Sequence, residues 1–247
     1  MLYRKMFSVL AALVLVAAGV FSSASYARTG DGKDKPAGAG KVPVEAPMNL
    51  AILVQDDLVS RVGSELGVTR DFIRSLPAGS QVMVGYITAG ALQLRQPFTP
   101  DLNKAAKALR MPIGSTSASA YNPYVEVVEA LKHFSSQRGH NGVLLISDGL
   151  DISRGFDSNS AGQTLDLERA IREANRQNVA VYSFYAPSVG LTGRSRLAAS
   201  YGQSSLNRLS DETGGKAYFQ GTTGFVTFDS YFDRLRQTLN EQYGRAS

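Results

Sequence analysis

The chain has 247 residues, of which 43% are hydrophobic and 19% charged, and this length suits one globular domain with additional segments. It contains no cysteine, which excludes disulfide bonds, cysteine-ligated zinc and thiol nucleophiles. Only two histidines, His133 and His140, are present, which argues against a histidine-based zinc site and leaves few candidates for a histidine general base. The formal net charge of +5 is too mild to predict a nucleic-acid partner.

Residues 1–27 have the pattern of an export signal. Arg4 and Lys5 form a positive start, residues 7–21 are apolar, and small residues around Ala27 form a cleavage site. The apolar run of about 15 residues is shorter than the roughly 20 that span a bilayer. We expect cleavage and a secreted or periplasmic protein without a membrane span, a retained anchor being the alternative. No cysteine follows the segment, which excludes a lipid-anchored lipoprotein.

Residues 28–47 are rich in Gly, Lys, Pro and Ala and are interpreted as a flexible linker, followed by a domain over residues 48–243 and a tail at 244–247. Hydrophobic periodicity and turn residues predict strands at 50–54, 80–87, 91–98, 143–146, 179–185 and 216–220. They predict helices at 61–76, 99–110, 124–134, 166–177, 204–213 and 230–243.

Local signals add detail to these elements. Ala89-Gly90 predicts a hairpin turn before a half-exposed edge strand, and Thr99 with Pro100 predicts a helix start. Residues 186–202 are expected to form a long loop. The alternation of strands and helices predicts a three-layer, doubly wound α/β fold whose sheet is mainly parallel, with one antiparallel edge strand.

Acidic residues directly follow two of the predicted buried strands. Asp56 and Asp57 follow the first strand, and Asp148 follows the strand at 143–146. If these strands are parallel neighbours, the three carboxylates gather at one edge of the sheet. Ligands of open α/β sheets bind at this carboxyl edge, where the strand order reverses.

Several stretches together resemble a known family, over roughly residues 48–243. They are LAILVQDDLVSRVGSEL, LPAGSQVMVGYI, QPFTPDLNKAAKALR, VLLISDGLDISRGF, VAVYSFYAP and LNRLSDETGGKAYFQG. In this order they resemble the von Willebrand factor A (VWA) domain, and in particular exported bacterial VWFA-related proteins. The resemblance implies a VWA/Rossmann-like fold and a protein-binding role.

The resemblance also implies a metal-ion-dependent adhesion site. In the family this site combines Asp-x-Ser-x-Ser after the first strand, a Thr in a later loop and an Asp after the fourth strand. Such hard oxygen ligands suit Mg²⁺, which keeps a coordination position for an acidic residue of a partner. Asp148 in Ser-Asp-Gly matches the last of these positions.

The first part of the motif is degenerate in this chain. A motif that starts at Asp56 consists of Asp56, Leu58 and Ser60 and lacks the middle hydroxyl. A motif that starts at Gln55 consists of Gln55, Asp57 and Val59 and keeps one acid. The later hydroxyl falls in the loop before residue 123, where the candidates are Thr116, Ser117, Ser119 and Asn122. Asn122 is equally well placed to cap the following helix.

Two interpretations of these side chains remain open. In one, Asp56, Asp57, Ser60, Asn122 and Asp148 supply ligands to Mg²⁺, or to Mn²⁺ or Ca²⁺. In the other no cation is bound, Asp57 caps the next helix and Asp148 accepts hydrogen bonds from backbone N–H groups. Three clustered acids would repel one another and raise their pKa values, which favours a counterion. A lysine, an arginine or water can supply it as well as a metal.

We therefore expect an exported, non-enzymatic adhesion or scaffold module that binds an unknown protein partner at the carboxyl edge. The alternatives are a metal-independent structural protein of the envelope and a carboxylate-dependent hydrolase. No Gly-x-Ser-x-Gly motif follows a strand, which argues against a serine hydrolase. No lysine follows the strand at 179–185, which argues against a receiver domain of two-component signalling.

Overall fold

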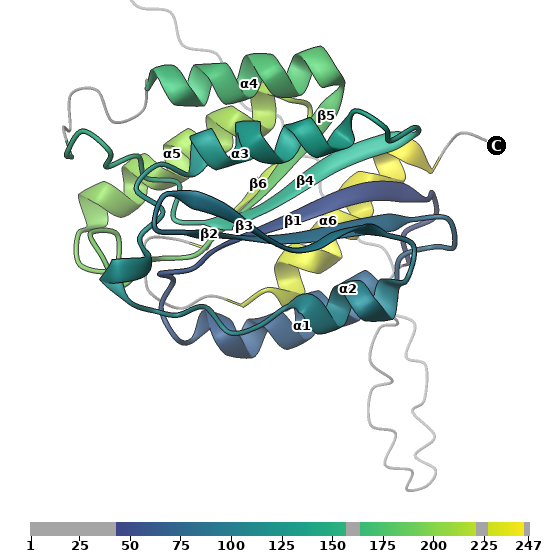
Figure 1. The fold of residues 1–247 in the computed structure, drawn as a ribbon, viewed down its shortest axis with the longest axis horizontal. Helices are drawn as coiled ribbons and strands as arrows, with labels where there is room; N and C mark the ends of the chain where they lie inside the picture. Colours follow the sequence, from purple (N-terminus) through teal and green to yellow (C-terminus); the bar gives the residue numbers. More distant parts are fainter. Residues whose placement is uncertain (1–42, 157–163, 221–226, 245–247) are drawn as a thin grey trace, which may run out of the picture. The chain divides into compact units, whose positions relative to one another are not determined.

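The computed structural model describes residues 43–156, 164–220 and 227–244 (Figure 1). The predicted export signal and the linker up to residue 42 lie outside this part of the chain. Ordered packing begins before the expected boundary at Met48, because Val44 is 5% exposed and belongs to the core. None of the described helices has the length and apolar character needed to cross a membrane.

Six strands form one sheet in the order β3-β2-β1-β4-β5-β6. They are β1 (Met48–Gln55), β2 (Gln81–Thr88), β3 (Ala91–Thr99), β4 (His140–Ser147), β5 (Val179–Tyr185) and β6 (Ala217–Tyr218). All neighbouring pairs are parallel except β2 and β3, which form the predicted hairpin through Ala89 and Gly90, both at positive φ. The predicted mainly parallel sheet with one antiparallel edge strand is confirmed.

Helices cover both faces of the sheet, as the predicted three-layer α/β fold requires (Figure 1). One face carries α1 (Val62–Arg74), α2 (Leu102–Ala108) and α6 (Asp229–Tyr243). The other carries α3 (Pro123–Leu131), which continues into the 3-10 turn η2 (Lys132–Phe134), α4 (Leu165–Gln177) and α5 (Arg196–Glu212). A further 3-10 turn, η1 (Thr116–Ala118), precedes α3.

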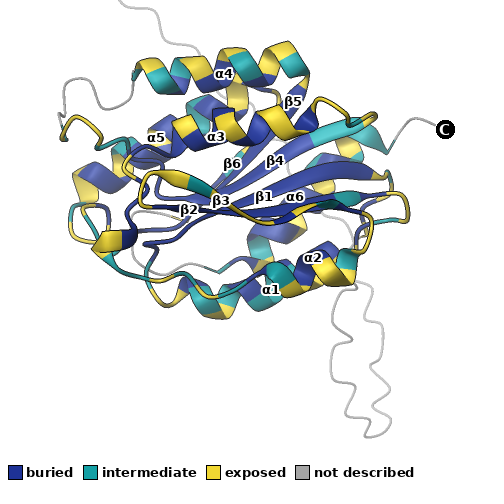
Figure 2. Cartoon of the chain, viewed as in Figure 1, coloured by how far each residue is buried: buried dark blue, intermediate teal, exposed yellow. Residues whose placement is uncertain are grey.

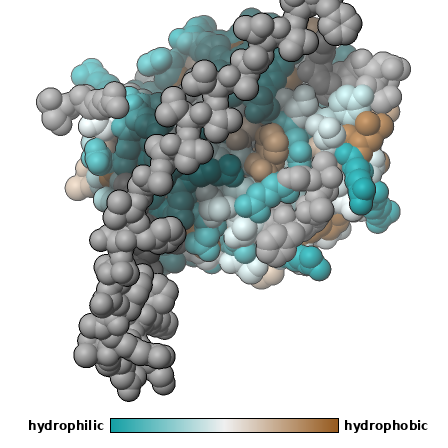
Figure 3. Space-filling view, turned by 180° about the vertical axis from the view of Figure 1, so that it is seen from behind, coloured by the Kyte–Doolittle hydropathy of each residue, from teal (hydrophilic) through white to brown (hydrophobic). Residues whose placement is uncertain are grey.

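The central strands are buried on both faces, so their side chains alternate between two cores (Figure 2). Every residue of β1 is buried, which explains its continuous apolar run. Ile52 packs on the α1 and α6 side, and Leu53 packs on the α3 and α4 side. Seen from behind, the brown hydrophobic areas of the surface are small and separated by teal and white ones (Figure 3). Scattered apolar residues of this kind are normal on a protein surface.

Several predicted boundaries were wrong, including that of β4, which begins at His140 and not at residue 143. The helix expected at 204–213 begins at Arg196, because the Ser195 side chain caps it by accepting a hydrogen bond from Ala198 N; the expected long loop therefore ends at Ser195. The helix expected from Thr99 begins at Leu102, because Asp101, and not Thr99, is the capping residue. The last strand is only Ala217–Tyr218.

The strand order reverses between β1 and β4. From β1 the sheet continues through β2 to β3 on one side, and from β4 through β5 to β6 on the other. The carboxyl ends of β1 and β4 therefore lie side by side, with Val54 opposite Ile146. This is the topological switch point at which ligands bind in open α/β sheets.

Candidate functional site at the carboxyl edge of the sheet

A cavity of about 240 Å³ opens at this switch point. The loops after β1, β4 and β5 and the loop before α3 enclose it. Its lining residues are Gln55, Asp57, Thr116, Ser119, Tyr121, Asp148, Leu150, Ile152, Ser188, Gly190 and Leu191. It thus combines two carboxylates, several hydroxyls and an apolar wall, and we call it the carboxyl-edge cavity.

Gln55 holds the two strand ends together beneath this cavity. Its Oε1 accepts hydrogen bonds from Ser147 Oγ at 2.6 Å and from Asp148 N at 3.1 Å. Its Nε2 donates to Asp57 Oδ1 at 2.7 Å. The amide therefore directs its N–H group toward Asp57. Gln55 and Asp57, which belong to the motif that starts at Gln55, line the cavity together with Asp148.

Asp57 and Asp148 are almost fully buried, with 3% and 5% of their surface exposed. Burial, together with the nearby charge of Asp148, raises the pKa of Asp57 to about 6, although hydrogen bonds from Gln55 and Ser119 act in the opposite direction. Burial likewise raises the pKa of Asp148, against hydrogen bonds from Ser188, Leu150 N, Thr192 and Gln55. The pair thus carries negative charge that its neutral partners only partly stabilise.

Asp56 is oriented away from these two acids and is already neutralised. Arg110 donates from both terminal nitrogens to its two carboxylate oxygens at 2.6 Å each. Thr88 Oγ1 and Ile113 N also donate to it, at 2.6 and 2.9 Å. Burial alone would raise its pKa, but these hydrogen bonds and the charge of Arg110 lower it below the ordinary value. The structure therefore assigns Asp56 to a buried ion pair rather than to the cavity.

The other predicted site residues are also outside the cavity lining. Ser60 is exposed in the turn before α1. Asn122 caps α3, since its Oδ1 accepts from Tyr124 N at 3.1 Å, and its Nδ2 donates to Asp151 and Asp166. Of the loop hydroxyls, Thr116 and Ser119 line the cavity. Among the described residues, no three His, Cys, Asp or Glu side chains form a group that could hold a metal ion.

The two contacts expected for the acids in the interpretation without a cation have different outcomes in the structure. Asp148 Oδ1 does accept a hydrogen bond from a backbone N–H group, that of Leu150, at 3.1 Å. The expectation that Asp57 caps the next helix was wrong, because α1 begins after Arg61 without any side-chain cap. Asp57 instead remains at the end of β1, facing Gln55 and Ser119.

Backbone hydrogen bonds fix the loops around the cavity. Val189 N donates to Asp57 O at 2.9 Å, and Gly114 N donates to Asp56 O at 2.9 Å. Ile152 N donates to Tyr121 O at 2.7 Å. Tyr121 has a φ of 55°, a left-handed conformation that is uncommon for a bulky residue. The sequence analysis missed Ser188, Thr192 and Arg110, because no motif relates them to the strand ends.

The close approach of α5 to the turn after β4 leads to a testable prediction. A Cβ on Gly202 would overlap the carbonyl oxygen of Asp148. We expect Gly202→Ala to displace α5 and lower the free energy of unfolding by about 1–3 kcal/mol. Gly67→Ala in α1 is the control, because its Cβ would meet no atom within 4 Å and should stabilise the helix by about 0.5–1 kcal/mol. Urea unfolding measures both, and a Gly202→Ala variant as stable as the parent would contradict the packing argument.

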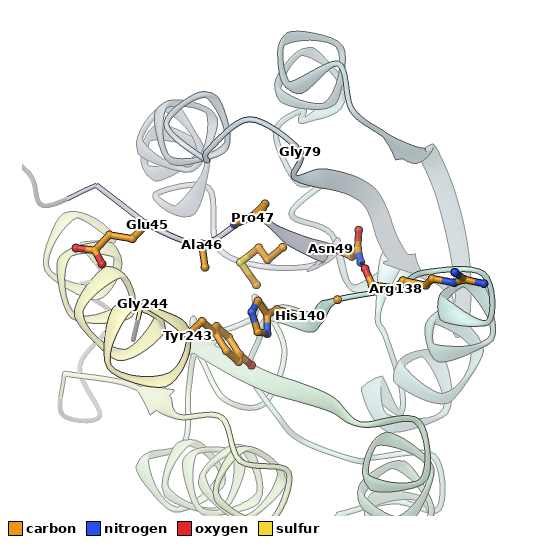
Figure 4. A pocket seen from close by; sticks show the side chains of 11 residues that line it. Glu45, Ala46, Pro47, Asn49, Gly79, Arg138, His140, Tyr243 and Gly244 are labelled. Carbon is orange, nitrogen blue, oxygen red and sulfur yellow. Dashed lines mark hydrogen bonds between the residues drawn. The ribbon is translucent and has the colours of Figure 1, made fainter. Parts of the chain in front are cut away.

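A second cavity, of about 420 Å³, lies at the opposite, amino edge of the sheet (Figure 4). His140 and Tyr243 stack there with ring centroids 4.2 Å apart. Asn49 Nδ2 donates to Arg138 O and to Asn141, so this wall is already hydrogen-bonded. Neither His140, which begins β4, nor the exposed His133 lines the carboxyl-edge cavity. We favour the carboxyl edge as the functional site because it contains the two buried acids.

Comparison with known proteins identifies the fold and no closer relationship. No protein-family model and no curated protein matches the sequence. The conserved hypothetical protein BatB from Bacteroides thetaiotaomicron is similar in structure, with a TM-score of 0.56 and 13% identity, over 81% of this chain and 100% of that one. An aerotolerance-related membrane protein from Bacteroides fragilis gives a TM-score of 0.53 and 13% identity, over 79% and 100%.

The human COPII-coat protein Sec24c is also similar, with a TM-score of 0.50 and 9% identity over 79% of this chain and 32% of that one. At these identities the likeness concerns the fold alone. The chain has a VWA/Rossmann-like α/β fold, which it shares with these proteins.

Proposed function

We propose that this chain is an exported VWA-like interaction module that binds a protein partner at the carboxyl edge of its sheet, through a degenerate adhesion site. The carboxyl-edge cavity is the observation that supports this most directly. It lies at the switch point, and its two buried acids carry charge that the fold does not neutralise. Groups with perturbed pKa values in a cavity are candidates for function. Export is supported by the pattern of residues 1–27.

The surroundings of the cavity also suit a protein partner. Met111 and Ile113, in the loop tied to the end of β1, are 60% and 55% exposed, and Tyr121 is 47% exposed. Exposed apolar residues that surround a polar centre are typical of protein-binding surfaces. The alternative, a carboxylate-dependent hydrolase, would use Asp57 and Asp148, and a turnover that is lost in Asp148→Ala while the fold is kept would identify it.

The cation that the family resemblance implies does not fit these residues well. In the register that starts at Gln55, this residue stands where the motif has its first Asp, and its N–H group is directed at Asp57. Asp56 is neutralised by Arg110, and Asn122 is used as a helix cap. Both oxygens of Asp148 already accept hydrogen bonds, from Leu150 N and Thr192 Oγ1. We therefore propose a site without a tightly held Mg²⁺, Mn²⁺ or Ca²⁺.

Thermal unfolding tests the absence of a tight metal site. Residues from Lys41 onward form one compact unit, and we expect its midpoint to be unchanged when EDTA is replaced by Mg²⁺, Mn²⁺ or Ca²⁺. A cation at about 100 times its dissociation constant would add about 2.7 kcal/mol. For a domain of this size that is a rise of roughly 5–10 °C. Such a rise, lost in Asp148→Ala, would restore the adhesion-site interpretation.

Site-specific photo-crosslinking in the cell envelope tests the interaction itself. A crosslinker at Ile113, beside the cavity, is expected to capture one partner in stoichiometric amount. The same group at His133, which is exposed near the amino edge, is the matched control and should not capture it. Equal capture at both positions, or none at Ile113, would contradict binding at the carboxyl edge.

A further inference from the structure

The acids of the carboxyl-edge cavity have no cationic partner. Among the described residues, neither Asp57 nor Asp148 forms an ion pair, and no lysine, arginine or histidine lines the cavity. Their hydrogen-bond donors are all neutral. Burying charge without an opposite charge is costly, and proteins normally pair such groups. Within the part of the chain that the structure describes, no positively charged group pairs with these two acids.

The neighbouring Asp56 illustrates what such a group does. The guanidinium of Arg110 bonds both of its oxygens and lies over the ring of Tyr86, with 4.1 Å between the guanidinium carbon and the ring centroid. The result is a carboxylate with a lowered pKa, whereas burial has raised the pKa of Asp57. Asp56 and Asp57 follow each other directly after β1, but only Asp56 is paired with a cation among the described residues.

The walls of the cavity suit a long side chain with a charged end. Besides the acids, the lining contains the side chains of Tyr121, Leu150, Ile152 and Leu191. Lysine and arginine place their methylene groups along apolar surface while their charged ends reach polar partners. The hydroxyls of Thr116, Ser119 and Ser188 offer further acceptors for N–H groups. The aromatic ring of Tyr121, 47% exposed, is available to a cation as Tyr86 is to Arg110.

The size of the cavity agrees with this occupant. Its volume is about 240 Å³. A single dehydrated ion would occupy a small part of this space. A whole side chain uses both the apolar walls and the acids.

We propose that the carboxyl-edge cavity receives a lysine or arginine side chain of the protein partner, whose positive group pairs with Asp57 and Asp148. This inference rests on the proposed function and specifies which kind of side chain the partner inserts into the cavity. It reverses the recognition that the family resemblance implies, in which a metal ion bridges to an acidic residue. Charge complementarity here is direct, and arginine is among the residues most often found at the energetic centre of interfaces.

Blocked peptides test the charge of the occupant. NMR titration of the protein with acetyl-Gly-Arg-Gly-amide and acetyl-Gly-Lys-Gly-amide is expected to shift the amide signals of Asp57, Tyr121 and Leu150. The same peptides with glutamine, or with glutamate in the presence of Mg²⁺, should leave these signals in place. Binding of the glutamate peptide with Mg²⁺, or no shift with either basic peptide, would overturn the proposal. If free arginine binds more tightly than its blocked peptide, the ligand is a small molecule and the proposal of a protein side chain is wrong.

Matched variants locate the binding. Asp57→Asn and Asp148→Asn keep the size of the side chain and one acceptor oxygen but remove the charge, and each should weaken binding of the basic peptide at least tenfold. Asp71→Asn removes one negative charge from α1, where its side chain is 74% exposed, and should have no effect. Equal weakening by all three variants would indicate a general charge effect and contradict the site.

Crosslinking separates this inference from the proposed function. If the Ile113 crosslinker still captures the partner in Asp57→Asn and Asp148→Asn at the parental level, binding at the carboxyl edge stands and the basic side chain is wrong. If capture is lost in both variants and kept in Asp71→Asn, both proposals are supported. If the parent captures nothing at Ile113, the proposed function itself fails.

Discussion

Replacing Arg110 by alanine is expected to lower the free energy of unfolding by about 3–5 kcal/mol, because it leaves the Asp56 carboxylate buried without its cation. Asp56 has a fully buried side chain, whereas that of Arg110 is 30% exposed. Water that enters at the vacated position can partly solvate Asp56, so we expect the lower end of this range. A loss of about 3 kcal/mol corresponds to a decrease of roughly 6–12 °C in the unfolding midpoint of a domain this size.

The pH dependence of this variant identifies the cause. In the parent the pKa of Asp56 is lowered, so its ion pair stabilises the fold above the ordinary pKa of 3.8, and this contribution is lost as the pH falls below it. Without Arg110, burial raises the pKa of Asp56, and protonation removes the buried charge. The difference in stability between parent and variant should therefore become smaller between pH 7.5 and pH 5.

Arg176→Ala serves as the control for Arg110→Ala. Arg176 pairs with Glu173 on the surface of α4, with 69% of the arginine side chain exposed. Such pairs contribute at most about 1 kcal/mol. A similar small loss for Arg110→Ala in urea unfolding would mean that Asp56 does not depend on its arginine.

Asp57→Asn is expected to stabilise the free protein at pH 8 by about 1–3 kcal/mol, the opposite of what a mutation in a buried hydrogen-bonded site usually does. The pKa of Asp57 is raised from 3.8 to about 6. A shift of about two pKa units corresponds to at most about 3 kcal/mol of destabilisation when the group is charged. Asparagine keeps an oxygen for the hydrogen bond from Gln55 and removes the charge.

The sign of the pH effect follows from the raised pKa. The folded state binds the Asp57 proton more tightly than the unfolded state, so the full penalty is present above about pH 6 and decreases as the pH falls from 6 toward the ordinary pKa of 3.8. The parent should therefore gain stability from pH 8 to about pH 5, and Asp57→Asn should gain less. Guanidinium unfolding at several pH values measures this. A variant that is less stable than the parent at pH 8 would show that the charge is neutralised within the fold.

These two variants together separate structural from functional charge. Asp56 and Asp57 are adjacent after β1, yet the two variants are expected to have opposite effects. Removing Arg110, the partner of Asp56, should destabilise the fold, and removing the charge of Asp57 should stabilise it. Proteins tolerate such destabilising groups where function requires them. The stabilising effect of Asp57→Asn, combined with loss of peptide binding, would identify Asp57 as a binding residue.

The amino-acid sequence by itself determined most of the architecture. Continuous apolar runs predicted the buried parallel strands, Ala89-Gly90 predicted the hairpin, and the order of elements predicted the three layers. Because parallel strands end at a common edge, the sequence also predicted that Asp56, Asp57 and Asp148 would gather there, and of these three Asp57 and Asp148 line the cavity. All these inferences depend on local patterns, which repeat every two or 3.6 residues and need no knowledge of distant contacts.

Only the tertiary structure decided how the acids at this edge are used. Asp56 and Asp57 lie in the turn that follows β1, where their side chains enter different surroundings. Asp56 meets Arg110, which is 54 positions away along the chain, and no spacing in the sequence announces that contact. Ser188 and Thr192 reach Asp148 in the same way, from the loop after β5. Whether a buried charge is neutralised depends on which distant side chain packs against it, and that is a property of the folded chain.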